Sequence, residues 1–122
     1  MAIRVHLALA AFAASLALHQ GAAAAPSAEN GKTAFVKHGC WQCHGFEGQG
    51  SVASSGGRVI ADTQLPFEAF QAYVRDPSGS MPPFHAEVVS DTDLADIYAY
   101  LQSRPKPKPA KDIPQLNNLS KR

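Results

Sequence analysis

The stretch CWQCH, residues 40–44, contains three side chains that can bind a metal or form a covalent bond. The thiols of Cys40 and Cys43 are three positions apart, and the imidazole of His44 follows directly. A disulfide between the cysteines would enclose only two residues, so it would constrain few conformations of the unfolded chain. A thioredoxin-like redox pair belongs beside a βαβ pattern, and we find no such pattern. The two cysteines therefore need another explanation.

A zinc site and covalent haem attachment are the other interpretations of this motif. Structural zinc normally takes four ligands. His38 or His85 could complete a set with Cys40, Cys43 and His44, but no second ligand pair occurs at zinc-finger spacing. C-x-x-C-H is the specific signal for haem attachment, because two thiols at this spacing can add to the two vinyl groups along one side of the macrocycle. The motif predicts one covalently attached haem c, with His44 beneath the iron.

The second axial position of the iron decides what such a haem does. Met81 is the only methionine besides the initiator, and it lies in the segment DPSGSMPPF. A single methionine is often an adaptable core residue, but here prolines oppose regular structure and fix the chain direction. His85 is the competing ligand. We expect Met81 to bind the iron together with His44, because histidine and methionine are the ligand pair of electron-carrying cytochromes.

The N-terminal residues have the pattern of a secretory signal peptide. Arg4 precedes an apolar run from Leu7 to Leu18, and alanines occupy residues 22–25. The run is shorter than the ~20 apolar residues that a membrane-spanning helix needs. We therefore expect residues 1–25 to be removed and the mature chain to reach the periplasm without stable membrane insertion. Export favours covalent attachment, because a cofactor held by bonds cannot dissociate outside the cytoplasm.

Charge divides the rest of the 122-residue chain into an acidic domain and a basic tail. Residues 26–103 contain nine acidic and four basic residues, whereas residues 104–122 contain six basic residues and one acidic residue. The tail opens with RPKPKPAK, a composition typical of a flexible, solvated polyproline-like extension. Docking to an acidic partner or to membrane headgroups is the alternative. The basic residues are not interleaved with aromatic residues, so we expect no binding of nucleic acid.

Three helices are expected to position the candidate haem residues. Apolar periodicity, capping residues and prolines predict helices over residues 29–38, from Pro66 to before Pro77, and from Ser90 to near residue 103. Gly31 lies inside the first helix, where glycine costs roughly 1 kcal/mol relative to alanine, so another helix should approach closely there. Residues 45–64 contain five glycines and read as an irregular loop. No segment alternates like a strand, which predicts an all-α domain.

A domain this small has little apolar surface to bury and usually needs a further stabilising element besides its side chains. A haem in the middle would supply it. Trp41 is expected near the exposed haem edge. The glycines of GFEGQG would let the backbone pass close to the porphyrin. The expected apolar shell consists of Ile60, Phe67, Phe70, Val74 and Phe84.

The segments GKTAFVKHGCWQCHGFEGQG, GSMPPF and SDTDLADIYAYL resemble the small class I c-type cytochromes of bacterial periplasms. The similarity covers roughly residues 28–103. It implies a cytochrome c-like fold of three to four short helices wrapped around one covalently attached haem. In that family the first and last helices cross at near right angles, and residues at their contact have counterparts here. These are Gly31 and Phe35 on the first helix, and Tyr98 with Leu94 or Leu101 on the last.

The same resemblance implies an electron-transfer protein rather than an enzyme. Its donor would be a protein such as a periplasmic dehydrogenase, and its acceptor a terminal oxidase or another cytochrome. The chain would act as a monomer or as a subunit of a dehydrogenase complex. With both axial positions filled, the iron has no site for a substrate. A haem sensor or a peroxidase-like enzyme, in which Met81 is displaced or never binds, is the alternative from a different functional class.

Overall fold

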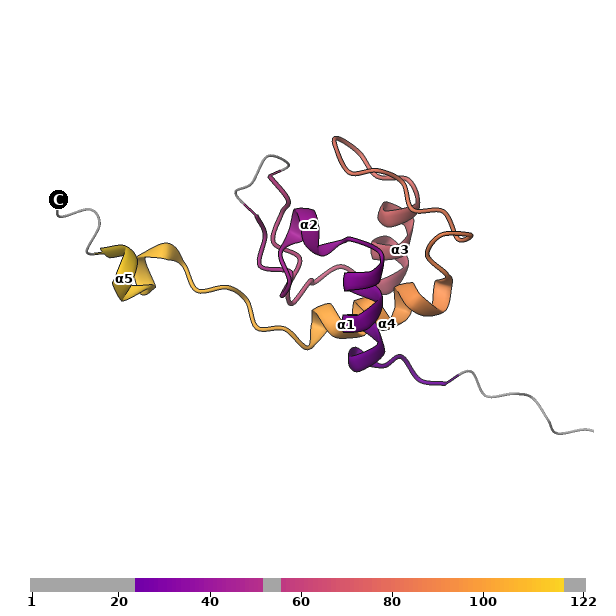
Figure 1. The fold of residues 1–122 in the computed structure, drawn as a ribbon, viewed down its shortest axis with the longest axis horizontal. Helices are drawn as coiled ribbons and strands as arrows, with labels where there is room; N and C mark the ends of the chain where they lie inside the picture. The colour runs from indigo at the N-terminus through magenta and orange to yellow at the C-terminus, as the bar shows by residue number, and fades with distance from the viewer. Residues whose placement is uncertain (1–23, 52–55, 118–122) are drawn as a thin grey trace, which may run out of the picture.

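The computed structural model describes residues 24–51 and 56–117, which contain helices and loops and no strand. The prediction of an all-α fold is confirmed. Nearly all of the predicted signal peptide lies outside the described residues. The domain contains helices α1 (Ala28–Lys37), α2 (Trp41–His44), α3 (Phe67–Arg75) and α4 (Asp91–Gln102), and the tail contains a 3₁₀ turn, η1 (Ala110–Asp112), and helix α5 (Pro114–Asn117) (Figure 1).

A serine side chain caps the N-terminus of each of the two longest described helices, α1 and α4. The Ser27 hydroxyl accepts a hydrogen bond from the backbone N–H of Asn30 at 3.3 Å, and the Ser90 hydroxyl accepts one from the backbone N–H of Asp93 at 3.0 Å. Each bond satisfies one of the N–H groups that a helix start leaves without an internal partner. Helix α4 ends at its C-cap residue, Ser103. Both predicted ends of this helix are therefore confirmed.

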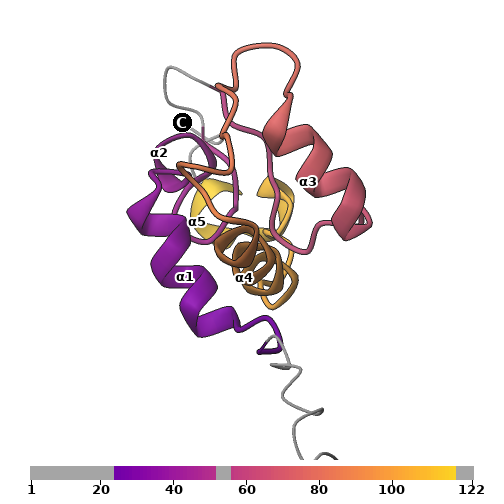
Figure 2. The ribbon, with the colours of Figure 1, turned by 90° about the vertical axis from the view of Figure 1, so that its right-hand side faces the viewer.

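Helices α1 and α4 cross steeply: in Figure 1 α1 stands upright over a nearly horizontal α4, and Figure 2 looks almost along α4. Gly31 is buried at the crossing. A Cβ atom on Gly31 would overlap the backbone carbonyl of Asp96 and would lie 2.8 Å from the Cβ of Tyr100. The buried ring of Phe35 packs beside that of Tyr100, with 5.7 Å between the ring centroids. The glycine thus permits the close approach that its place in the sequence predicts.

The aromatic residue of α4 that meets α1 is Tyr100, so the prediction of Tyr98 at this crossing is wrong. The Tyr98 ring instead packs on Phe67 and Phe70 of α3, with ring centroids 5.4 and 5.3 Å apart. Its hydroxyl donates to the carbonyl of Leu65 at 2.7 Å. Residues two positions apart on an α-helix point about 200° apart around its axis. The two tyrosines consequently face different helices.

Helix α4 lies between α1 and α3 and is the centre of the core (Figure 2). Buried side chains of these three helices and of the segment before α4 form one cluster. Its members are Ala34, Phe35, Phe70, Val74, Val89, Leu94, Ile97, Tyr100 and Leu101. Partly buried residues of the predicted site also pack against it, namely Cys40, Trp41, Ile60, Phe67, Met81 and Phe84. The motif and the methionine loop therefore share one core.

The tail begins with contacts to the domain and then leaves it (Figure 1). Arg104 forms an ion pair with Glu47 at 2.9 Å, and Lys106 lies 3.8 Å from a carboxylate oxygen of Asp62. Further along, η1 and α5 place short helical turns in the segment that the sequence suggested to be extended. Over the described parts of the chain, no helix has the length and apolar character to cross a membrane.

Candidate haem site

Helix α2 presents the two thiols and the imidazole of the motif in helical register. The backbone N–H groups of Cys43 and His44 donate to the carbonyl of Cys40 at 3.3 and 3.1 Å. The N–H of Cys40 donates to the carbonyl of Phe35 at 3.2 Å, which ties the motif to the end of α1. Residues three and four positions apart on a helix are neighbours on its surface. The short helix therefore places all three reactive side chains on one face.

The imidazole ring of His44 is oriented by a backbone carbonyl. Its Nδ1 atom lies 2.8 Å from the carbonyl oxygen of Arg58. A carbonyl oxygen can only accept a hydrogen bond, so Nδ1 carries the proton and donates it. The Nε2 atom of the neutral ring then keeps its lone pair, as a metal-binding histidine requires. The residues of this structure thus fit an iron bound at Nε2.

Gly57 allows the loop that carries this carbonyl to approach α2. A Cβ atom on Gly57 would overlap the carbonyl oxygen of Cys43 and would lie 3.1 Å from the backbone nitrogen of His44. The backbone N–H of Gly50 donates to the carbonyl of His44 at 2.8 Å, so the loop contacts the motif at a second point. The sequence suggested that nearby glycines pass close to the porphyrin. For Gly57, the contact that the structure shows is with the backbone of α2.

The two cysteines are free and partly buried. Burial raises the pKa of the Cys40 thiol to about 11, and the neighbouring Cys43 adds to this shift. The reactive cysteine of a redox C-x-x-C pair has a lowered pKa, so Cys40 is unsuited to that chemistry. Within residues 24–51 and 56–117, no group of three His, Cys, Asp or Glu side chains could hold a metal ion. The arrangement supports neither the redox-pair nor the zinc interpretation.

The other two candidate histidines are not gathered around the motif. The side chain of His38 is 8% exposed, and its Nε2 atom lies 2.8 Å from Oδ2 of Asp93, which links α1 to α4. His85 is exposed, and its carbonyl accepts the N–H groups of Val88 and Val89 at 3.0 Å in the turn before α4. The His38 ring thus has a partner within the fold, and the backbone of His85 shapes the turn before α4.

Met81 lies in the loop between α3 and α4, half-buried against the core cluster. Each predicted shell residue either belongs to that cluster or packs against it; these are Ile60, Phe67, Phe70, Val74 and Phe84. The methionine loop is bonded to the end of α3, because the backbone N–H of Phe84 donates to the carbonyl of Val74 at 3.0 Å. The predicted second ligand therefore has the apolar surroundings that the sequence suggested.

The residues directly after the motif are tied to the end of α4. The Tyr100 hydroxyl donates to the carbonyl of Phe46 at 2.8 Å. Arg104 pairs with Glu47, and its guanidinium lies 5.1 Å from the centroid of the Tyr100 ring. The hydrogen bond from Arg104 lowers the pKa of Glu47. Phe46 also stacks on Trp41, with 4.4 Å between ring centroids, so the tryptophan between the two cysteines packs on this loop.

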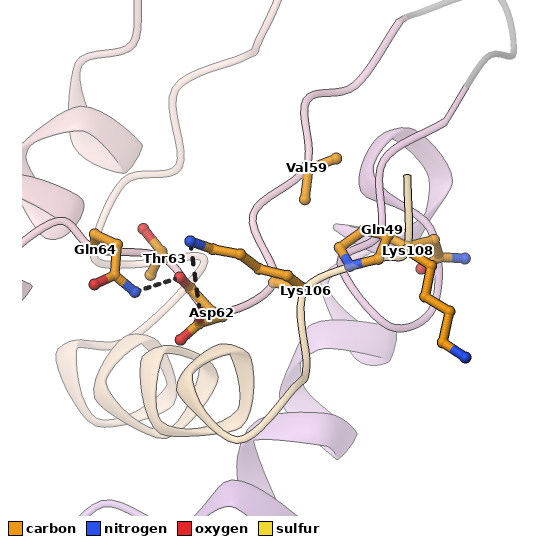
Figure 3. A pocket seen from close by; sticks show the side chains of 9 residues that line it. Gln49, Val59, Asp62, Thr63, Gln64, Lys106 and Lys108 are labelled. Carbon is orange, nitrogen blue, oxygen red and sulfur yellow. Dashed lines mark hydrogen bonds and ion pairs between the residues drawn. The ribbon is translucent and has the colours of Figure 1, made fainter. Parts of the chain in front are cut away.

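A groove of about 490 Å³ lies where the tail leaves the domain (Figure 3). Residues 59 and 61–64 of the long loop form part of its wall, and residues 106–108 of the tail form another part. Lys106 reaches across it to Asp62, whose backbone carbonyl also accepts a hydrogen bond from Gln64 at 2.8 Å. None of the four predicted haem residues lines this groove. It is therefore separate from the haem site.

An all-helical domain with C-x-x-C-H on a short helix and an oriented histidine defines a c-type cytochrome. The family model described as cytochrome C oxidase, cbb3-type, subunit III matches residues 26–101. The chain belongs to this family of c-type cytochromes, and its cofactor is a c-type haem. No curated protein and no solved structure matches it.

Two kinds of contact at this site could not be found from the motif. Arg58 contributes its backbone carbonyl, so the residue type at this position carries no signal. Arg104 and Glu47 are 57 positions apart, and neither sits in a recognisable pattern. Gly57 is a local signal for these contacts. Its position in the glycine-rich loop indicates that the loop approaches another part of the backbone closely, but it does not identify that part.

Proposed function

We propose that the protein is a periplasmic carrier of single electrons, with its haem attached through Cys40 and Cys43 and bound at the iron by His44 and Met81. The bound haem supplies reversible one-electron chemistry at its iron. The observation that carries the proposal is the 2.8 Å contact between Nδ1 of His44 and the carbonyl of Arg58, which leaves Nε2 available to a metal.

The chain's own residues have separate tasks in this function. The thiols of Cys40 and Cys43 would anchor the haem, and Nε2 of His44 would bind its iron. The soft thioether of Met81 would be the second ligand, and a ligand of this kind favours reduced iron. The apolar side chains around Met81 keep water out and add to that preference. With His44 and Met81 as its two protein ligands, the iron of a bound haem would offer no position to a substrate, and we propose electron transfer rather than catalysis.

We propose a periplasmic dehydrogenase as the donor and a terminal oxidase as the acceptor. The name of the family, which refers to a subunit of cytochrome c oxidase, supports the oxidase. The signal-peptide pattern of residues 1–25 supports export. Mass spectrometry of the periplasmic fraction should find a chain cut near residue 25 that carries one haem. The bare peptide mass in correctly matured material would contradict covalent attachment.

The ligation by Met81 is tested by one absorption band. The ferric protein should show the sulfur-to-iron charge-transfer band, and Met81→Ala should lose it completely because the variant has no thioether to bind. His85→Ala is the control variant and should keep the band. Absorption spectra of the purified ferric proteins make the comparison.

Two other results would replace this proposal. If the unmutated protein lacks the band and its reduced form binds carbon monoxide strongly, the position is open and the protein is a sensor or a peroxidase-like enzyme. If the band is absent and the spectrum changes in His85→Ala, His85 is the second ligand.

A further inference from the structure

The loop that carries Met81 is held by two side chains of α3, one on each side of the methionine. The hydroxyl of Tyr73 donates to the backbone carbonyl of Ser78 at 3.1 Å. The Nη1 group of Arg75 donates to the backbone carbonyl of Phe84 at 2.6 Å. Ser78 and Phe84 lie three residues before and three residues after Met81. Both bonds end on the main chain, so they constrain the path of the loop itself.

Arg75 is fixed in turn by the start of α4. Its Nη2 group lies 2.7 Å from Oδ1 of Asp91, and Nε2 of Gln71 donates to the same oxygen at 2.8 Å. The hydrogen bonds from Arg75 and then Gln71 lower the pKa of Asp91. A planar guanidinium can serve two acceptors at once. Arg75 therefore joins α3, the carbonyl of Phe84 and α4.

The segment between the two anchors has few other constraints. Residues 79 and 80 form a turn, and residues 81–83 belong to no helix, strand or turn. Pro82 and Pro83 have no N–H to donate. The nearest backbone bond after Met81 is the one from the N–H of Phe84 to the carbonyl of Val74. Besides the packing of Met81 on the core and the bond from Phe84 to Val74, the place of the thioether consequently depends on the contacts made by Tyr73 and Arg75.

We propose that Tyr73 and Arg75 are positioning residues that hold the thioether of Met81 at the iron and so decide how readily another ligand displaces it. This inference rests on the proposed function, in which Met81 is the second axial ligand. Without one anchor, the loop moves away at a lower cost in free energy. The apparent affinity of an incoming base rises in proportion to the population of the open loop.

The test is an imidazole titration of the ferric holoprotein, followed by the loss of the charge-transfer band. Arg75→Met should bind imidazole about tenfold more tightly, the effect expected for one hydrogen bond from a charged donor. Tyr73→Phe should bind it about threefold more tightly, because only a neutral hydrogen bond is removed. Both anchors should also slow amide exchange at Phe84, which provides a second readout.

Lys106→Met is the control. It also removes a cation–carboxylate pair, but Lys106 and its partner Asp62 line the groove that is separate from the haem site. It should bind imidazole as the unmutated protein does, even where its stability is lower. If Arg75→Met does not fold, Arg75→Lys takes its place, because a lysine cannot hold both of the arginine's acceptors in the same fork geometry.

The possible failures are distinguishable. Equal imidazole affinities in Arg75→Met, Lys106→Met and the unmutated protein would overturn the positioning role and leave the ligation by Met81 intact. Absence of the charge-transfer band from the unmutated protein would overturn that ligation, and this inference with it.

Discussion

His44 is oriented by an atom that every amino acid possesses. The carbonyl of Arg58 accepts the Nδ1 proton, so the orientation of the His44 ring depends on where the chain runs rather than on the side chain at position 58. The path in turn depends on Gly57, which lies where any Cβ would overlap the backbone of α2. Residues of the motif thus provide the chemistry, and their neighbours in the loop provide the orientation.

Gly57→Ala should disturb this orientation. The added methyl group must push the loop away from α2, which lengthens the bond from His44 to the carbonyl of Arg58. Forced overpacking of this kind lowers the free energy of unfolding by about 2 kcal/mol. Guanidinium titration of the holoprotein measures the change.

Arg58→Ala is the control for that variant, because it removes an exposed side chain and keeps the carbonyl. Its stability should stay close to that of the unmutated protein. A larger loss in Arg58→Ala than in Gly57→Ala would mean that the arginine side chain, not the carbonyl, matters at this position.

Helix α4 supports both halves of the site with two different faces. Tyr100 packs on Phe35 of α1 and holds the loop after the motif, whereas Tyr98 packs on α3, which leads into the methionine loop. The crossing of α1 and α4 at Gly31 therefore fixes the C-x-x-C-H motif relative to the loop that carries Met81. A shift at this crossing would change the positions of both.

Gly31→Ala should destabilise the protein although alanine is the better helix former. The propensity gain is at most about 1 kcal/mol, and the overlap with the Asp96 carbonyl outweighs it, for a net loss of roughly 2 kcal/mol. Lys32→Ala, an exposed change in the same helix, should alter stability by less than about 0.5 kcal/mol. Denaturant unfolding of both variants makes the comparison, and a Gly31→Ala protein more stable than the parent would contradict the packing described here.

The acidic domain and the basic tail attract each other at their junction. Arg104 pairs with Glu47 in the loop after the motif, and Lys106 pairs with Asp62. Beyond these two residues, η1 and α5 contact each other. The first residues of the tail consequently belong, by their contacts, with the helical domain.

Arg104→Met should lower the free energy of unfolding slightly, since it removes a surface ion pair and a cation–π contact. Lys108→Met, a neighbouring loss of the same charge, should change stability little. The pKa of Glu47 is lowered in the folded protein, so the contribution of the pair is complete above the ordinary value of 4.5 and disappears as the pH falls below it. Thermal unfolding at several pH values tests this, and an effect of Arg104→Met that persists in strong acid would contradict it.

Local patterns were enough to predict the haem motif and the main helices. The residues of C-x-x-C-H lie within five positions, and the cap at Ser90 lies three positions from the N–H that it accepts. Interactions over so few residues depend on backbone geometry that every helix shares, so the sequence pattern is enough to predict them. The same holds for Gly31, whose cost inside a helix already indicated a close neighbour.

Long-range packing decided the rest, because it depends on which way each helix turns its faces. Tyr98 and Tyr100 are nearly equivalent in the sequence, and only the docking of α4 between α1 and α3 assigns one to each side. The acceptor for His44 is a backbone oxygen 14 residues away, and the anchor on Phe84 comes from Arg75, nine residues before it. Neither contact can be predicted from composition or spacing, because main-chain carbonyls are the same at every position. Only the folded path of the chain brings each carbonyl within hydrogen-bond distance of its donor.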